Sequence, residues 1–454
     1  MKKALLILFF ALSFSSQAQF WQNVSTSFST VSSGVSEISY AIDPNTIWVS
    51  AYDGVTVANN VQKWAKTSDN GVTWTSGSIE VGNANLGIGD LSAIDANNCY
   101  ALINPTATSG TALGGVWKTS NGGATWVKQT TASYNAATSF PNIVHFFNAN
   151  DGVTMGDPAG GYFEIYTTSN GGVNWTRVPS SNIPLPLNTD EFGYTGKRET
   201  RGNTIWFGTS VGRLYKSTDK GLTWTVGDVT PVPDFGGAIT SGTSGNVMFR
   251  DDNNGLLMDN NYGLWDTNDG GTTWNSISYA GAYRSSQMSY VPGTPNTYVV
   301  TGNDIEADLR GTSFSEDGGL NWTNINDLEP TPANTGGSIE FYDCTHGIIG
   351  GFTTSSTVGG AYMNTHDYCV SFATSTFSND KLFSANISNK VLEVYGKDIT
   401  NVTVFDVLGK QVLNNNFTSV TNASLNVDLL NSAVYLVKVT NNLGNTSTIK
   451  VVRN

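Results

Sequence analysis

The sequence predicts an all-β protein in which a seven-bladed β-propeller is followed by a small Ig-like β-sandwich. Three observations support this fold class. A phrase such as KSTDKGLTWT, at residues 216–225, returns along most of the chain. The 454 residues include 49 Gly, 12 Trp, 18 Tyr and 21 Phe, a composition that favours strands joined by turns. After Phe372 the repeat stops and a different alternating pattern begins.

The repeated phrase has a fixed internal order. Its third position carries an acidic or amide side chain, and a tryptophan follows five residues later. The six copies place these pairs at Asp69 and Trp74, Asn121 and Trp126, Asn170 and Trp175, Asp219 and Trp224, Asp269 and Trp274, and Asp317 and Trp322. Successive copies are 52, 49, 49, 50 and 48 residues apart. A period of about fifty residues with several short strands predicts a β-propeller with one four-stranded blade per repeat.

Each unit reads as four short strands. In the fifth unit, GNVMFRDD, GLLMDN, YGLWDTND and TTWNSIS follow in that order. The next interval leads to Asp367, but Cys369 stands where a glycine is expected and no tryptophan follows. Residues 20–24, FWQNV, are similar to the outer strands of other units. Because a ring must close to avoid leaving free strand edges, we expect this N-terminal strand to complete the seventh blade.

Folding alone explains the repeated phrase. An Asp or Asn oxygen accepts backbone N–H groups within a tight turn, glycine supplies the positive φ, and tryptophan packs between sheets. Asn121 and Asn170 keep these hydrogen bonds but lose the charge, an exchange that a metal ligand or a general acid tolerates poorly. We therefore interpret the six copies, called the repeat turns below, as structural. We predict no catalytic residue, metal or cofactor.

The form Ser/Thr-x-Asp-x-Gly-x-x-Trp resembles the Asp-box, or BNR, repeat of sialidases, sortilin-type receptors and photosystem II assembly-factor-like propellers. The resemblance covers roughly residues 20–372. The stretches GDPAGGYFEIYTTSNGG and WFGTSVGRLYKSTDKGLTW are most similar to the assembly-factor-like group. The resemblance implies a propeller domain over residues 19–372.

The chain after residue 372 has a different sequence pattern. A polar stretch at residues 373–380 is the predicted linker, and residues 381–454 alternate like the strands of a small sandwich. DVLGK, LNSAVY and the terminal IKVVRN resemble the type A sorting domain of the type IX secretion system. Ala433 stands where that family usually has glycine, a minor departure. The resemblance implies a Bacteroidota protein that the type IX secretion machinery recognises as its partner, and that is then released or attached to the cell surface.

The N-terminus reads as an export signal. Two lysines precede an apolar run at residues 4–14, and SQA marks a cleavage site before Gln19. The run is too short to span a bilayer. We therefore expect residues 1–18 to be a signal peptide, and the mature protein to be secreted or held at the cell surface.

The charge distribution excludes one class of partner. Residues 19–376 hold 14 basic and 31 acidic side chains, a net charge of −17, whereas residues 377–454 hold 7 and 5, a net charge of +2. A propeller this acidic repels phosphate backbones, so we expect no nucleic acid partner. We also expect a monomer.

Two functions remain open for the propeller. The first is a binding or assembly module that holds a protein or glycan ligand on the face opposite the repeat turns. The ends of second strands place four carboxylates on that face: Asp53, Asp157, Asp259 and Asp304. They predict a ring that attracts a cation, a sugar or a basic peptide, although solvated loop carboxylates remain an alternative interpretation.

The second function is a sialidase-like glycoside hydrolase at the channel mouth. The resemblance implies an arginine cluster, a tyrosine nucleophile paired with a glutamate, and an acidic proton donor. The first unit has no Arg-Ile-Pro-like start, but Arg198 and Arg284 are predicted on inner strands, with Tyr194 and Glu199 near Arg198. Arg198 and Arg284 are therefore candidate ligand-binding residues, and the binding module is the favoured interpretation.

The three cysteines predict one disulfide. In a meander the first and third turns of a blade lie on the same side, so Cys344 and Cys369 of the seventh blade are placed to approach each other. Export to an oxidising compartment permits the bond. Cys99, in the apolar stretch CYALI, is expected to be buried and free.

Overall fold

The structure is a computed structural model. It describes residues 20–30, 32–56, 59–105, 114–236, 245–259, 261–302, 311–325, 338–355, 358–369, 383–388, 390–406, 410–443 and 446–453. The chain divides into two compact units, residues 1–370 and 371–454. The expected signal peptide and linker lie outside the described residues. Within the described part of the chain, no helix has the length and hydrophobicity of a membrane-spanning segment.

The first unit has an all-β, propeller-like fold. Apart from one short 3₁₀ helix, η1 (Ser180–Asn182), its regular elements within the described ranges are strands. Consecutive strands pair in antiparallel groups of four. The groups are β2 (Ser33–Tyr40), β3 (Ile47–Asp53), β4 (Lys63–Thr67) and β5 (Thr75–Ser78); β6 (Leu86–Ala93), β7 (Cys99–Pro105), β8 (Gly115–Thr119) and β9 (Val127–Lys128); β10 (Pro141–Phe146), β11 (Gly152–Pro158), β12 (Phe163–Thr168) and β13 (Thr176–Arg177); β14 (Glu199–Arg201), β15 (Thr204–Gly208), β16 (Arg213–Ser217) and β17 (Thr225–Asp228); β18 (Gly245–Phe249), β19 (Gly255–Asp259), β20 (Leu264–Thr267) and β21 (Asn275–Ser276); and β23 (Gln287–Tyr290), β24 (Tyr298–Gly302), β25 (Gly311–Ser315) and β26 (Asn321–Asn324). A short strand, β22 (Ala280–Gly281), pairs in parallel with β26.

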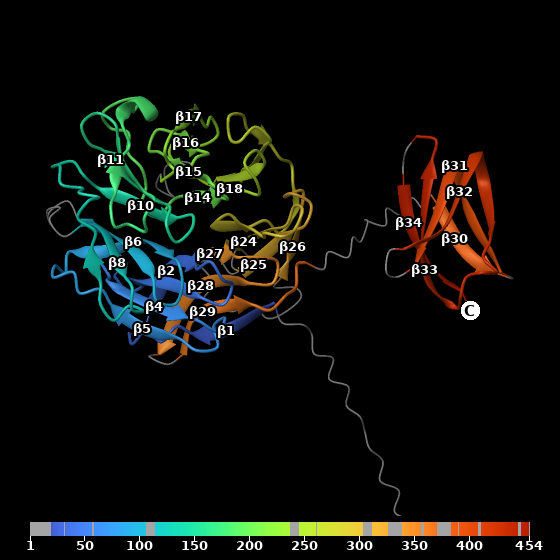
Figure 1. Ribbon diagram of the computed structural model, residues 1–454, viewed down its shortest axis with the longest axis horizontal. Coiled ribbons are helices and arrows are strands. Elements are labelled where there is room, and N and C mark those ends of the chain that lie inside the picture. Colours follow the sequence, from blue (N-terminus) through green and yellow to red (C-terminus); the bar gives the residue numbers. More distant parts are fainter. Residues whose placement is uncertain are drawn as a thin grey trace, which may run out of the picture. The chain divides into compact units, whose positions relative to one another are not determined.

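The last group joins the two ends of the unit. β27 (Ile339–Phe341), β28 (Gly347–Ser355) and β29 (Val358–Asn364) pair in order, and β1 (Trp21–Ser25) pairs antiparallel with β29. The expected completion of this group by the N-terminal strand is therefore present. Figure 1 shows β2, β10, β14, β18 and β27 nearest the centre of the unit, with β1, β5 and β17 at its periphery.

The repeat turns hold the third strand of a group to its fourth. In the first turn, the Asp69 carboxylate accepts hydrogen bonds from the Thr73 backbone N–H at 2.8 Å and the Thr73 hydroxyl at 2.6 Å. Gly71 has φ +83°, a conformation that a residue with a Cβ adopts at a cost. Asn121 accepts the equivalent backbone bond from Thr125 at 2.9 Å, so the amide replaces the carboxylate as an acceptor.

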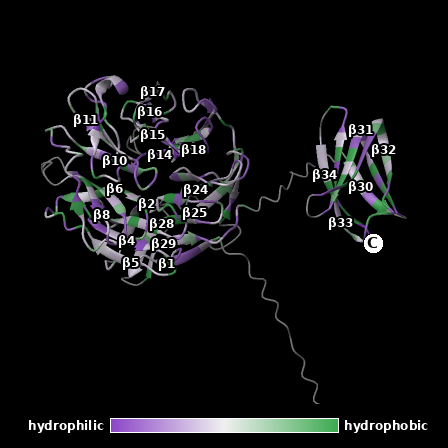
Figure 2. Cartoon of the chain, in the orientation of Figure 1, coloured by the Kyte–Doolittle hydropathy of each residue, from purple (hydrophilic) through white to green (hydrophobic). Residues whose placement is uncertain are grey.

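Aromatic side chains fill the space between neighbouring groups. Figure 2 shows hydrophobic residues concentrated along the strands. Trp48 and Trp64 pack with centroids 5.0 Å apart, and Trp126 of the next group joins them. Burial of such large surfaces is the main stabilising contribution between sheets.

Cys344 and Cys369 form a disulfide with Cα atoms 5.0 Å apart. It joins the turn after β27 to the segment after β29, where the glycine and tryptophan of a repeat turn are missing. Cys99 is free and buried. The bond therefore fastens the group that lacks a complete repeat turn.

The second unit is an antiparallel sheet of long strands. Its elements are β30 (Phe383–Ser388), β31 (Val391–Asp406), β32 (Gln411–Asn426), β33 (Ala433–Asn441) and β34 (Thr446–Arg453). β31 pairs with three partners: β30, β32 and β33. These strands enclose one apolar core that includes Val394, Val402 and Val437. Tyr435, 5% exposed, donates a hydrogen bond to the Asn431 carbonyl at 3.0 Å, so the tyrosine of LNSAVY holds the turn before β33.

The first prediction concerns ring closure. Trp21 is 1% exposed, and its Nε1 donates to Thr312 Oγ1 at 3.1 Å in the neighbouring group. Trp21→Ala therefore leaves a cavity where β1 meets two groups, and we expect it to lower the free energy of unfolding by about 3–5 kcal/mol. Chemical denaturation of the full chain measures this. Exposed Gln22→Ala on the same strand is the control, and equal stability of both variants would contradict the closure.

The second prediction concerns the repeat turns. The Asp219 carboxylate accepts from the Thr223 N–H at 2.9 Å and the Thr223 hydroxyl at 2.7 Å. Asp219→Asn keeps an acceptor oxygen, as Asn121 does, and we expect a small effect. Asp219→Ala leaves these donors without that acceptor and should cost about 1–2 kcal/mol. Thermal melting of the two variants compares them, and a larger loss for Asn than for Ala would overturn the structural interpretation.

Candidate functional site

A cavity of about 890 Å³ runs through the centre of the first unit. The first strand of every group contributes to its wall, namely β2, β6, β10, β14, β18, β23 and β27. The wall mixes charged side chains with aromatic and aliphatic ones. We call this cavity the central channel.

An arginine that lines the channel pairs with a buried aspartate. Arg198, just before β14, donates from Nη1 to Asp90 of β6 and from Nη2 to the Leu91 carbonyl at 3.1 Å. Asp90 is fully buried, and its carboxylate also accepts the N–H groups of Leu91 and Val144, each at 2.8 Å. The charge of an arginine held this way is balanced locally by the carboxylate, and two of its five N–H donors are engaged.

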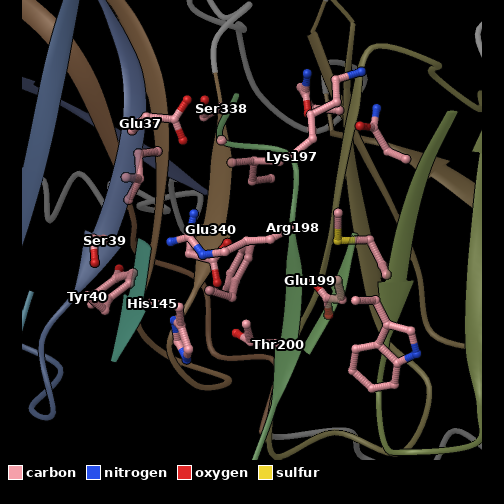
Figure 3. A pocket seen from close by; sticks show the side chains of 18 of the residues that line it. Glu37, Ser39, Tyr40, His145, Lys197, Arg198, Glu199, Thr200, Ser338 and Glu340 are labelled. Atoms are coloured by element: carbon pink, nitrogen blue, oxygen red, sulfur yellow. The ribbon is translucent and has the colours of Figure 1, made fainter. Parts of the chain in front are cut away.

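Two further carboxyl groups face the channel from neighbouring strands. Glu37 lies on β2 and Glu340 on β27, and both line the cavity. Figure 3 shows Arg198 extending toward the wall that carries them. Burial, together with the charge of Asp90, raises the pKa of Glu37 to about 8 although Arg198 acts against the shift. Burial also raises the pKa of Glu340, against the effects of Arg201 and Arg198.

Glu199 lies next to Arg198 in sequence but points to the other side of its strand (Figure 3). Its carboxylate pairs with Arg201 at 3.0 Å and accepts the Phe249 N–H of β18 at 3.0 Å. Burial raises the pKa of Glu199 to about 7 against the favourable charge of Arg201. Glu199 therefore joins two inner strands, and its oxygen is already engaged.

His145 and Tyr40 line the same channel. Burial and the charge of Arg198 lower the pKa of His145 to about 3, so this imidazole is neutral at physiological pH. Burial raises the pKa of Tyr40 well above its ordinary value. The Tyr40 hydroxyl is buried and has no hydrogen-bond partner among the described residues.

The predicted ring of aspartates is engaged in its own turns. Asp53 accepts the N–H groups of Val55 and Thr56, and Asp259 accepts those of Asn261 and Gly263. A carboxylate used in this way caps a turn. Asp304 lies outside the described residues. The ligand-binding role of these residues stays a prediction.

The Asp157 carboxylate links β10 to the segment that precedes β14. It accepts from Asn142 Nδ2 at 2.6 Å and from the Gly193 N–H at 3.1 Å. Burial raises the pKa of Asp157 to about 6, against those hydrogen bonds. Asp157 does not line the central channel in the described part of the chain.

The candidate residues near Arg198 do not all converge. Tyr194 donates its hydroxyl to Asp234 and does not line the channel, as far as the described residues define it. The prediction that Arg284 lies on an inner strand is wrong. Arg284 precedes β23, is 5% exposed and donates to Asn324 Oδ1 on β26 at 3.1 Å, because the chain there has not yet entered its inner strand.

Sequence reasoning missed Asp90, Glu37 and Glu340. Each acid lies within the first strand of its group: LGIGDLSA for Asp90, SGVSEISY for Glu37 and IEF for Glu340. A charged residue inside a first strand is a usable signal, because that strand is surrounded by protein. The repeat gives the position of such strands, and a search of each one for acids would have found all three.

Comparison with known proteins agrees with the fold. A sequence comparison with curated proteins gives no match. The chain is similar to the structure of YCF48 from Cyanidioschyzon merolae, with a TM-score of 0.51 and 15% identity, covering 76% of this chain and 99% of that one. This likeness shows a shared propeller-like fold.

Two other similar structures have lower scores. One is described as YCF48 bound to D1 peptide, with a TM-score of 0.49 and 15% identity over 76% of this chain and 97% of that one. The other is a sialidase from Trypanosoma rangeli in complex with 2,3-difluorosialic acid, with a TM-score of 0.42 and 9% identity over 95% and 87% of the two chains.

The C-terminal unit matches a known domain family. Residues 384–454 match the family described as secretion system C-terminal sorting domain. Such a domain implies an interaction with the type IX secretion machinery. The chain is therefore a propeller-like protein that ends in a secretion system C-terminal sorting domain and is exported by type IX secretion to a secreted or cell-surface location.

Proposed function

We propose that the exported propeller is a binding or assembly module that holds a protein or glycan ligand at its central channel. The observation that carries this proposal is the channel itself, about 890 Å³ in volume and lined by all the first strands. Concave sites with a few charged groups among apolar walls are typical of ligand binding. Thr195, Lys197 and Phe235, from segments that join the outer strand of one group to the inner strand of the next, line part of this channel.

The proposal also covers the number of blades, the fold of the second unit and the domain boundaries. Seven groups of four strands support a seven-bladed propeller over residues 19–372. The apolar core of β30 to β34 supports an Ig-like sandwich over residues 381–454. We also propose that residues 1–18 are a cleaved signal peptide, that residues 373–380 are a linker and that the mature protein is a monomer.

A glycoside hydrolase is the second candidate function. It is favoured by the raised pKa values of Glu37 and Glu199, because a carboxylic acid protonated near neutral pH is a proton donor. Against it, Glu199 is held by Arg201 and Tyr194 by Asp234, so the described groups do not form a nucleophile and acid facing one substrate. The binding module accounts for these contacts better.

The channel assignment is tested by obstructing it. Ser36 lines the channel, so Ser36→Trp should remove capture of ligands from a glycan array and from outer-membrane proteins. Val72, 81% exposed on a repeat turn, provides the control Val72→Trp. Full capture by Ser36→Trp, with both variants folded, would place the ligand elsewhere. Hydrolysis of aryl glycosides that Glu199→Gln abolishes would favour the enzyme.

Stability should fall as the pH rises through the range in which the channel acids ionise. Glu37 and Glu199 have folded pKa values of about 8 and about 7, above the 4.5 of an ordinary glutamate. The folded state therefore binds these protons more tightly, and its advantage is complete below pH 4.5 and lost as pH passes through 7 and 8. We expect the melting temperature to fall by several degrees between pH about 6 and about 9.

The matched variant for this pH effect is Glu37→Gln, which cannot ionise. It should flatten the decline, whereas Glu80→Gln on an exposed loop should leave the decline unchanged. A wild-type melting temperature that is constant or rises over this range would show that these acids are ionised without cost.

A further inference from the structure

Glu37 and Glu340 differ from the other acids of the channel. Asp90 and Glu199 each hold an arginine, at Arg198 and Arg201. In contrast, neither the Glu37 nor the Glu340 carboxylate has a hydrogen bond or an ion pair with any residue that the structure describes. Two acids on adjacent inner strands are therefore left with only the more distant charge of Arg198 and Arg201.

The cations of the channel are already engaged. Arg198 is held by Asp90 and the Leu91 carbonyl, and Arg201 is held by Glu199 and, at 2.7 Å, by the Thr200 carbonyl. Lys197 donates to the Phe235 carbonyl at 2.7 Å. Pairing within the described wall therefore leaves the Glu37 and Glu340 carboxylates as charged groups that lack a partner.

We propose that the channel takes the cationic end of a polypeptide side chain, a guanidinium or a primary ammonium group, at the carboxylates of Glu37 or Glu340. This inference rests on the proposed binding function and names its ligand class. A hydrogen-bonded cation stabilises the ionised form of a carboxylate, and guanidinium presents a planar set of donors that matches carboxylate geometry.

The Tyr40 hydroxyl in the wall also favours a ligand that carries N–H donors. The buried Tyr40 hydroxyl lies three residues beyond Glu37 on β2 and has no hydrogen-bond partner among the described residues. A buried hydroxyl without a partner is costly, and a ligand N–H donor that reaches it removes the cost. Figure 3 shows Tyr40 on the same wall as Glu37, beside His145.

The field of the whole domain supports cation entry. Residues 19–376 carry 14 basic and 31 acidic side chains, and a net charge of −17 raises the local concentration of cationic ligands around the domain. An anionic ligand would have to enter against this field and compete with Asp90 for Arg198. The cationic ligand meets neither obstacle.

Binding should also displace protons. The charged and titratable groups around Glu37 are Asp90 of β6, His145 of β10, Lys197 and Arg198 before β14, and Glu340 of β27. Burial raises the pKa of Glu37 to about 8, and His145 stays neutral with a pKa of about 3. A bound cation favours the ionised carboxylate, so affinity should rise with pH between about 6 and about 9.

Isothermal titration calorimetry of the full chain tests the ligand class. The probes are the end-capped peptide Gly-Ser-Arg-Ser-Gly and two versions in which citrulline or glutamate replaces arginine. Citrulline keeps the shape of arginine and removes its charge. We expect the arginine peptide to bind at least about tenfold more tightly than the citrulline peptide, and to release protons in buffers of different ionisation enthalpy.

Variants assign the effect to the channel. Glu37→Gln and Glu340→Gln keep the side-chain shape, and each should remove most of the arginine preference and the proton release. Glu80→Gln should keep both. Equal binding of the arginine and citrulline peptides, or a preference that survives the double variant Glu37→Gln with Glu340→Gln, would overturn the assignment.

The failure of this inference is distinct from failure of the proposed function. Capture of a neutral or acidic ligand that Ser36→Trp blocks would retain the binding module and refute the cationic ligand. Binding that Ser36→Trp never affects would refute the channel as the site, and this inference with it.

Discussion

The pairing of β1 with β29 is the constraint on which the rest of the first unit depends. An open row of sheets leaves two exposed edges and no enclosed space. Residues from the start of the chain close the last group, and Trp21 binds this group to Thr312 of its neighbour. The channel wall is therefore continuous, and residues as distant in sequence as Asp90 and Arg198 meet across it.

Closure also determines the electrostatics of the channel. The inner strands are surrounded by protein, so each ionisable group there must find a partner, keep a proton or remain accessible to a ligand. Asp90 and Arg198 take the first course, and Glu199 with Arg201 does the same. Glu37 and Glu340 take the second, as Glu199 also does through its raised pKa, and the third is open to Glu37 and Glu340 because they border the cavity and lack a partner among the described residues.

Much of the fold follows from the repeat. A turn that needs an acceptor oxygen, a glycine and a tryptophan leaves a local pattern, so Asp69 and Trp74 and their equivalents mark the units one by one. The cysteine pair and the N-terminal strand were predictable for a related reason, because both compensate for the missing turn after Asp367. The repeat turns depend on residues that are close together in sequence, and the disulfide and the N-terminal strand substitute for one such turn.

The site was harder to predict because its parts come from different units. The period of the repeat gives the position of an inner strand but not which side chains meet across the ring. Asp53 and Asp259 sit at strand ends that suggested a ligand ring, yet each accepts N–H groups of its own turn. Arg198 was identified, whereas its partner Asp90 lies 108 residues away, and no motif links the two positions.

Carboxyl footprinting of the full-length protein tests the central claim, that the channel acids are the contact points of a ligand. Carbodiimide and glycine ethyl ester modify accessible carboxyl groups, and mass spectrometry locates them. We predict that Glu37 and Glu340 are modified in the free protein and protected when the arginine peptide is bound. The exposed Glu80 and Glu316 should react equally in both states. Equal modification of Glu37 and Glu340 with and without bound ligand would contradict the account.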